Sequence, residues 1–95
     1  MEQIQKYKVY VDDVFDLYNT DRRYCAGEFC SYEDAENCCK KIIDDFIEAY
    51  GTDRDALSNA YYFHGESPFV MPSNSEKPFY ASAYYEEASK RHFIK

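Results

Sequence analysis

The chain has 95 residues, of which 45% are hydrophobic and 31% are charged, with only three glycines and three prolines. This composition is typical of one globular domain over residues 1–95 and excludes a disordered or collagen-like chain. Eighteen acidic against eleven basic residues give a formal net charge of −7. Because that charge opposes direct binding to nucleic-acid phosphates and to anionic membranes, it favours a basic protein as partner.

The sequence shows no targeting or membrane segment. The opening "MEQIQKYK" lacks the apolar stretch of a signal peptide, and no apolar run is long enough to span a bilayer. We therefore expect a soluble, cytoplasmic protein. Thiols stay reduced in that compartment, so the even number of cysteines, four, does not by itself indicate disulfides.

Two strands are expected first, in "KYKVYV", residues 6–11, and in "RYCAGEF", residues 23–29. Both segments are rich in aromatic and small or β-branched residues. Alternation would place one set of side chains on one face of each strand: Tyr7, Val9 and Val11 in the first, and Cys25, Gly27 and Phe29 in the second. The polar connection between the segments favours a long antiparallel hairpin.

A long helix is predicted between Ser31 and Gly51. Ser31 lies three residues before Asp34, and acidic residues crowd the first turn, as the positive end of a helix favours. Gly51 supplies a C-terminal stop. Apolar residues follow a repeat of three and four along one stripe: Ala35, Cys38, Cys39, Ile42, Ile43, Phe46, Ile47 and Tyr50. This stripe predicts a helix that packs on the hairpin.

Three shorter elements are expected after Gly51. Thr52, three residues before Asp55, predicts the cap of a second helix over "DRDALSNAYYF". The segment "PFVMP" is either a short edge strand or an extended packed loop. A C-terminal helix is expected over "SAYYEEASKRH", with Lys90, Arg91 and His92 in its last turn. Apolar residues would share one face of each helix: Leu57, Ala60 and Tyr61, and then Ala81, Tyr84, Tyr85 and Ala88.

These elements predict an α+β fold. A small antiparallel sheet, made of the hairpin and a short third strand if "PFVMP" forms one, would pack on the long helix, beside a short second helix and a C-terminal helix. Because two strands alone make a marginal sheet in water, we expect a third strand or the edge of a partner to complete it.

The four cysteines, all within residues 25–39, raise the question of a metal site. Cys38 and Cys39 lie in the helix stripe, where a free cysteine packs as a small apolar residue. A zinc site would have to combine Cys25 and Cys30, spaced C-x4-C, with a helix cysteine and His64, without the C-x2-C spacing of strong zinc motifs. The sequence therefore favours core packing and predicts no metal and no cofactor.

The segment "HGES" is the main candidate for catalysis, because Glu66 could orient the His64 imidazole for acid–base work. The alternative interpretation is a polar loop. Since no nucleophile elbow, phosphate-binding glycine loop or H-E-x-x-H pair accompanies this segment, we leave enzymatic activity open and lean against it.

Aromatic residues are abundant, with eleven tyrosines, seven phenylalanines and no tryptophan, more than so small a core can hide. Exposed tyrosines among carboxylates are typical of a contact surface. They would equally fit boundary positions, with the ring buried and the hydroxyl wet. The residues that we single out for binding are Tyr10, Asp12, Asp13, His64, Glu66 and Phe69.

The segments "YKVYVDD", "RYCAGEF", "SYEDAENCCKKIIDDF", "FHGESPFVMP" and "FYASAYYEEA" resemble a family of small, uncharacterised bacterial proteins. The family pattern is approximately Y-x-V-Y-V-D-D-N-F, E-R-Y-x-x-G-x-F-x-x-Y-E-x-A, F-G-E-D-P-F-I-V-P and F-S-A-W-x-Y-A. Here Val14 stands where Asn is usual, His64 is extra, and Ser67 replaces Asp. The resemblance implies a cytoplasmic bacterial protein in which "VDD" and "GES-PF" matter more than the cysteines, and it implies no activity.

Two functions follow as hypotheses. The first is a non-enzymatic, acidic and tyrosine-rich interaction or regulatory module for a protein partner, with a sharper version in which it acts as a decoy that inhibits a nucleic-acid-binding protein. The second is a small enzyme or ligand-binding protein that uses the loop around His64 and Glu66. We also expect a homodimer, paired along the acid-poor first strand from Tyr7 to Val11 and ending before Asp12.

Overall fold

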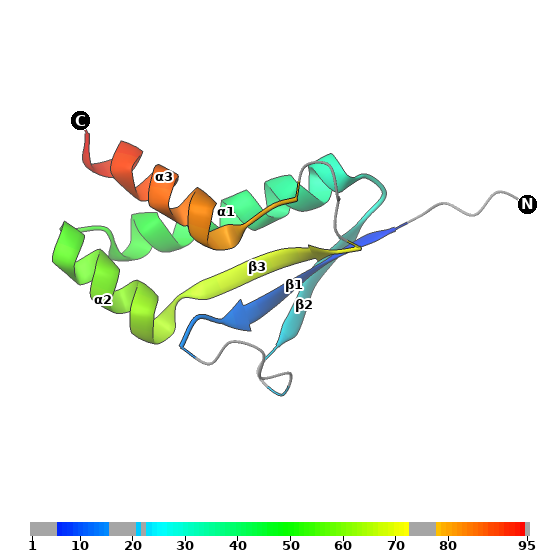
Figure 1. Ribbon diagram of the computed structural model, residues 1–95, viewed down its shortest axis with the longest axis horizontal. Helices are drawn as coiled ribbons and strands as arrows, with labels where there is room; N and C mark the ends of the chain where they lie inside the picture. Colours follow the sequence, from blue (N-terminus) through cyan, green and yellow to red (C-terminus); the bar gives the residue numbers. More distant parts are fainter. Residues whose placement is uncertain (1–5, 16–20, 22, 73–77, 95) are drawn as a thin grey trace, which may run out of the picture.

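The computed structural model describes residues 6–15, 21, 23–72 and 78–94. Figure 1 shows the six elements in chain order: β1 (Tyr7–Asp13), β2 (Tyr24–Phe29), α1 (Tyr32–Tyr50), α2 (Arg54–His64), β3 (Glu66–Met71) and α3 (Ala81–Phe93). The fold is α+β, as expected. Within the described part of the chain, no helix is long and apolar enough to cross a membrane.

The strands form one antiparallel sheet in the order β2-β1-β3. Val9 of β1 lies between Gly27 of β2 and Val70 of β3. The segment "PFVMP", for which a strand and a loop were both open, lies largely in the edge strand β3. Both sides of β1 are hydrogen-bonded within the sheet. The expected dimer contact along the edge of the first strand is therefore wrong, because β1 is the central strand and has no unpaired edge.

A bulge interrupts β2. Val9 pairs with Gly27 and Tyr10 pairs with Cys25, so that Ala26 has no partner in β1. One extra residue reverses the alternation of side chains. The prediction that Cys25 shares a face with Gly27 and Phe29 is therefore wrong: Cys25 lies on the side of Tyr10.

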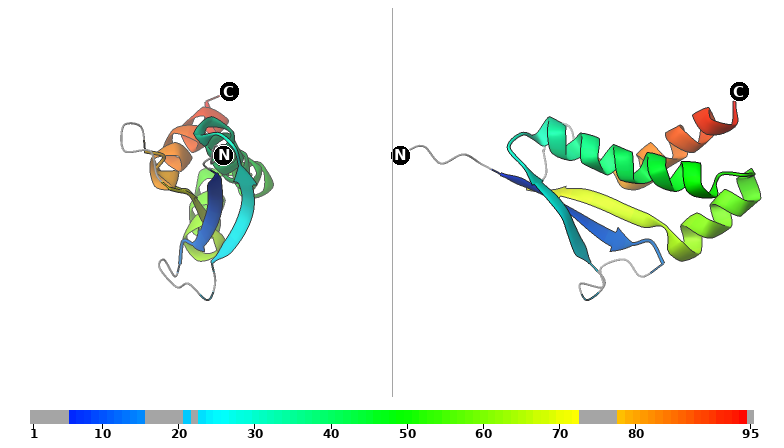
Figure 2. Two further views of the ribbon diagram at one scale, coloured as in Figure 1. Left: turned by 90° about the vertical axis from the view of Figure 1, so that its right-hand side faces the viewer. Right: turned by 180° about the vertical axis from the view of Figure 1, so that it is seen from behind.

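Helix α1 is formed and placed as the sequence predicts. The Ser31 hydroxyl accepts a hydrogen bond from the backbone N–H of Asp34 at 3.1 Å and caps the helix. Figure 2 shows α1 and α3 on the same side of the sheet. The small residues Ala35 and Cys39 are buried against Val9 and Val70, which lets the first half of α1 approach the strands closely.

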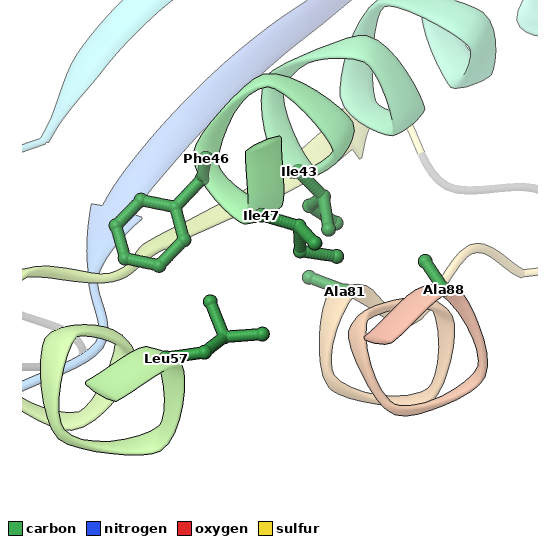
Figure 3. Close-up of a cluster of buried hydrophobic side chains, with 6 residues drawn as sticks. All are labelled: Ile43, Phe46, Ile47, Leu57, Ala81 and Ala88. Carbon is green, nitrogen blue, oxygen red and sulfur yellow. The ribbon is translucent and has the colours of Figure 1, made fainter. Parts of the chain in front are cut away.

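The second half of α1 packs against the other two helices. Figure 3 shows this core, in which α1, α2 and α3 bring together Ile43, Phe46, Ile47, Leu57, Ala81 and Ala88. Helix α2 is capped by Asp53, whose carboxylate accepts the backbone N–H of Ala56 at 2.8 Å. The predicted cap at Thr52 is wrong by one residue, because the Asp53 side chain takes that role. The basic last turn of α3 is confirmed.

The cysteines have different surroundings. Cys39 is fully buried, and burial raises the pKa of its thiol to about 12. Cys38 is half-buried, and burial raises its pKa as well. Cys25 and Cys30 are exposed, so core packing does not account for them. The prediction of core packing is thus confirmed for Cys39. It is wrong for Cys25 in β2 and for Cys30 just after β2, because both side chains lie on the surface.

Candidate functional site

Four of the six predicted binding residues line one small hollow, beside the end of β1 and the start of β3. Its walls come from Val11, Asp12, Asp13, Tyr24, His64, Gly65 and Glu66, and its volume is about 210 Å³. We call it the acidic hollow. The sheet register creates it, because Asp13 pairs with Glu66, and the backbone N–H of Val14 then donates to the carbonyl of Gly65 at 3.0 Å.

Asp12 has a structural partner. Its two carboxylate oxygens accept Nε and Nη2 of Arg23 at 2.6 and 3.1 Å, and only 6% of Asp12 is exposed. These hydrogen bonds raise the pKa of Arg23. The guanidinium also lies 4.9 Å from the centre of the Phe69 ring. The Asp12 carboxylate therefore balances the positive charge of Arg23, which lies against the sheet. Its position in "VDD" alone does not reveal this role.

Glu66 is engaged by Tyr24 and not by histidine. The Tyr24 hydroxyl donates to Glu66 Oε2 at 2.8 Å, and partial burial together with this hydrogen bond raises the pKa of Tyr24 to about 12. His64 is exposed. Among the residues that the structure describes, no hydrogen bond or ion pair joins His64 to Glu66. The two residues share the hollow, but the acid–base pair expected from "HGES" is not assembled.

Tyr10 and Phe69, the other two predicted residues, lie on the sheet face opposite α1. They are register partners in β1 and β3, and their rings stack with centres 5.9 Å apart. Both are half-buried, and Arg23 covers Phe69. The structure thus places four of the predicted residues around the acidic hollow and two in this stacked pair, and Arg23 links the two places through Asp12 and Phe69.

An exposed group of three aromatic residues adjoins the acidic hollow, and none of the three is among the residues predicted for binding. Phe15, Tyr62 and Phe63 are 59%, 61% and 54% exposed. Each ring contacts the other two, with centres 5.0–6.1 Å apart. We call this group the tip cluster. None of its three members belongs to either core cluster of the described residues, and monomeric proteins rarely expose large contiguous apolar patches.

Two local features hold the tip cluster beside the acidic hollow. The backbone N–H of Phe15 donates to Asp13 Oδ1 at 2.9 Å, which turns the chain at the end of β1. Gly65 ends α2 by donating its N–H to the carbonyl of Tyr61 at 2.9 Å. A Cβ at Gly65 would collide with that carbonyl oxygen, so glycine fits this close approach. The chain therefore passes directly from Phe63 to the wall of the hollow.

Helical spacing contains part of the signal for the tip cluster. Tyr61 lies on the face of α2 that contains Leu57, so the next two residues, Tyr62 and Phe63, must turn away from that face. Phe15 lies in the segment that follows the first strand, far from α2 in the sequence. Its approach to α2 depends on the β1–β3 pairing, which is a contact between distant parts of the sequence.

No family model, curated protein or solved structure matches this chain. The bacterial-family resemblance thus stays a prediction. The site consists of an acidic hollow, in which Asp12 and Glu66 accept hydrogen bonds from Arg23 and Tyr24, next to three packed and exposed rings. Its volume of about 210 Å³ lies below the roughly 300–1,000 Å³ of small-molecule sites. The described residues contain no group of three or more histidine, cysteine and acidic side chains arranged to hold a metal ion.

Proposed function

We propose that the chain is a non-enzymatic interaction module, which contacts a basic protein partner through the tip cluster and the acidic hollow beside it. The observation that carries this proposal is the joint exposure of Phe15, Tyr62 and Phe63, which are each more than half exposed. Aromatic side chains offer roughly 150–250 Å² each. They dominate the binding energy of many protein interfaces when a partner covers them.

The packing among the three rings favours binding. Each ring already rests on the other two, so that less side-chain freedom remains to be lost when a partner covers them. Immobilising a free side chain at an interface costs about 0.5–1.5 kcal/mol. A cluster that is already packed reduces this cost, so that more of the free energy gained by burying apolar surface contributes to affinity.

Charge selects the kind of partner. The net charge of −7 attracts basic proteins over long distances at low salt. Asp13 and Glu66 lie on the walls of the hollow beside the tip cluster, where a lysine or arginine of the partner would meet carboxylates next to apolar rings. A surface of this kind fits a partner segment that carries both basic and apolar side chains.

The decoy version of the proposal has less support. A decoy of nucleic acid needs an uninterrupted row of carboxylates. Two adjacent lysines lie between the acids of α1: Lys40 pairs with Glu36 at 3.5 Å and Lys41 pairs with Asp45 at 3.0 Å. These cations interrupt the negative surface of the helix, so we place the contact at the tip cluster and not along α1.

The enzyme alternative keeps one observation in its favour, since His64 and Glu66 line the same hollow. Against it stand the hydrogen bond that Tyr24 makes to Glu66 and the small volume of the hollow. In the pair expected from "HGES", Glu66 would have to hydrogen-bond the His64 imidazole and orient it as a general base, whereas Glu66 accepts the Tyr24 hydroxyl. The interaction module therefore accounts for more of what the site contains.

Quantitative capture from a source-cell lysate tests the proposal. The immobilised wild-type chain is compared with the double variant Tyr62→Ala, Phe63→Ala and with Tyr80→Ala, a matched control because Tyr80 is 65% exposed and lies outside the cluster. We expect basic proteins that bind the wild type and the control but not the double variant. Their binding should decrease as the salt concentration rises, because salt screens the charges. An identical set of proteins on all three chains would contradict the proposal.

A further inference from the structure

The two margins of the sheet differ in how well they are protected. β2 lies at one margin, as Figure 2 shows, and among the described strands it pairs with β1 alone. Four of its six residues are exposed and the other two are half-buried. No described residue pairs with the outer edge of β2, and other chains can use the backbone groups of such an edge as a template for strand pairing.

β3, at the opposite margin, is guarded. Pro68 lies in the middle of this strand and has no backbone N–H to offer. Phe79, Tyr80 and Ser82 border the same groove as Pro68 and Phe69, so that the segment leading into α3 lies alongside the strand. β2 has no proline and no lysine within Tyr24–Phe29. It does have a bulge at Ala26, which is another feature that can protect a sheet edge.

The charge distribution also singles out β2 for contact with a second copy. A chain with a net charge of −7 repels its own copies unless the contact surface is poor in carboxylates. β2 contains one acid, Glu28, and Lys6 neutralises it at 3.3 Å. The other side chains at the centre of the strand are small: Cys25, Ala26 and Gly27.

We infer that two copies of this chain associate by antiparallel pairing of their β2 strands about a two-fold axis. The two three-stranded sheets would then form one continuous sheet, and the unpaired edge of each copy would be covered by the other. This inference uses observations on β2 and does not depend on the proposed function of the tip.

The bulge supplies a clean test. Ala26 has no register partner in β1, and Ala26→Pro removes the backbone N–H of this residue from the strand that would pair with the second copy. Ala26→Lys instead places two positive charges near the two-fold axis, where they repel each other. Met71→Lys is the matched control, because Met71 is an exposed residue of the guarded strand β3. Circular dichroism verifies that each variant is folded.

Sedimentation velocity at micromolar concentration and moderate salt gives the readout. We expect a dimer for the wild type and for Met71→Lys, and a rise of about tenfold or more in the dissociation constant for Ala26→Lys. Ala26→Pro should behave in the same way. A monomeric wild type, or a dimer that both Ala26 variants leave unchanged, would overturn the inference. If Ala26→Pro does not fold, Ala26→Lys alone decides between these results.

Discussion

Neighbouring aromatic residues of α2 point in opposite directions, Tyr61 toward the core and Tyr62 and Phe63 toward solvent. The first residue stabilises the fold, and the other two form the proposed contact surface. Tyr61 lies over Tyr85 with the ring centres 3.6 Å apart and the planes 7° from parallel, and it contacts Phe46 at 6.0 Å. Tyr62 and Phe63, the next two residues, point outward to Phe15. Both groups consist of packed rings, but Phe46 belongs to the buried core and Tyr61 and Tyr85 pack against it, whereas all three rings of the tip cluster belong to exposed residues. Ring contacts alone therefore do not identify a structural cluster.

The energetic roles of the two groups should differ accordingly. Burying apolar surface contributes about 25 cal/mol per Å², so the inner rings stabilise the fold. The tip cluster leaves more than half of each ring exposed, so that most of this gain remains available to a partner. Substitutions can measure this division directly.

The largest effect is expected in the core that the inner rings cover. Ile43 is 2% exposed and Phe46 is 9% exposed, and truncation of either residue leaves a cavity between α1, α2 and α3. Ile43→Ala and Phe46→Ala should each lower the free energy of unfolding by about 2–5 kcal/mol. Urea denaturation monitored by circular dichroism measures this loss. Unchanged midpoints in both variants would contradict the assignment of the buried face of α1.

A smaller effect is expected from the paired variants Tyr61→Ala and Tyr62→Ala, which test the comparison itself. Tyr61→Ala should cost about 2 kcal/mol or more, because it removes a ring that the core and Tyr85 cover. Tyr62→Ala should cost less than about 1 kcal/mol, because it loses ring contacts on the surface only. Equal losses of stability in both variants would show that the tip cluster is structural.

High pH should lower the stability of the fold by ionising the partly buried Tyr61. Burial and, less strongly, the neighbouring Tyr85 raise the pKa of Tyr61 to about 12 in the folded chain, whereas tyrosine in an unfolded chain ionises at about 10. The folded state therefore holds this proton more tightly. The resulting stability is fully present below a pH of about 10 and is lost as the pH rises toward about 12. The free energy of unfolding should fall less steeply between about pH 10 and 12 in Tyr61→Phe than in the wild type. The same pH dependence in both chains would contradict the burial of the Tyr61 hydroxyl.

The smallest effect is expected from chelators and reductants. The four cysteines are free thiols, and the described residues offer no metal cluster. EDTA or dithiothreitol should therefore leave the thermal unfolding midpoint unchanged. A large loss of stability in EDTA that zinc restores would show that a metal holds the fold.

Local patterns predicted most of the elements, since strand alternation, the Ser31 cap and the stripe of α1 are short-range signals. Four residues of the acidic hollow were also predicted, His64 and Glu66 from the polar segment "HGES" and Asp12 and Asp13 from the "VDD" segment that the family resemblance emphasises. The sequence patterns missed the Ala26 bulge and the Asp12–Arg23 pair, which depend on how strands align. The tip cluster was missed for the same reason, because Phe15 meets α2 only through the β1–β3 pairing.

Amide hydrogen exchange of the chain, free and bound to a captured basic partner, tests the central claim most directly. Binding through the tip cluster should slow exchange at residues 13–15 and 62–66, while the amides of the core segment 43–47 change little. Protection confined to β2, or to the groove that Asp44 and Arg91 line between α1 and α3, would contradict the claim and place the partner elsewhere.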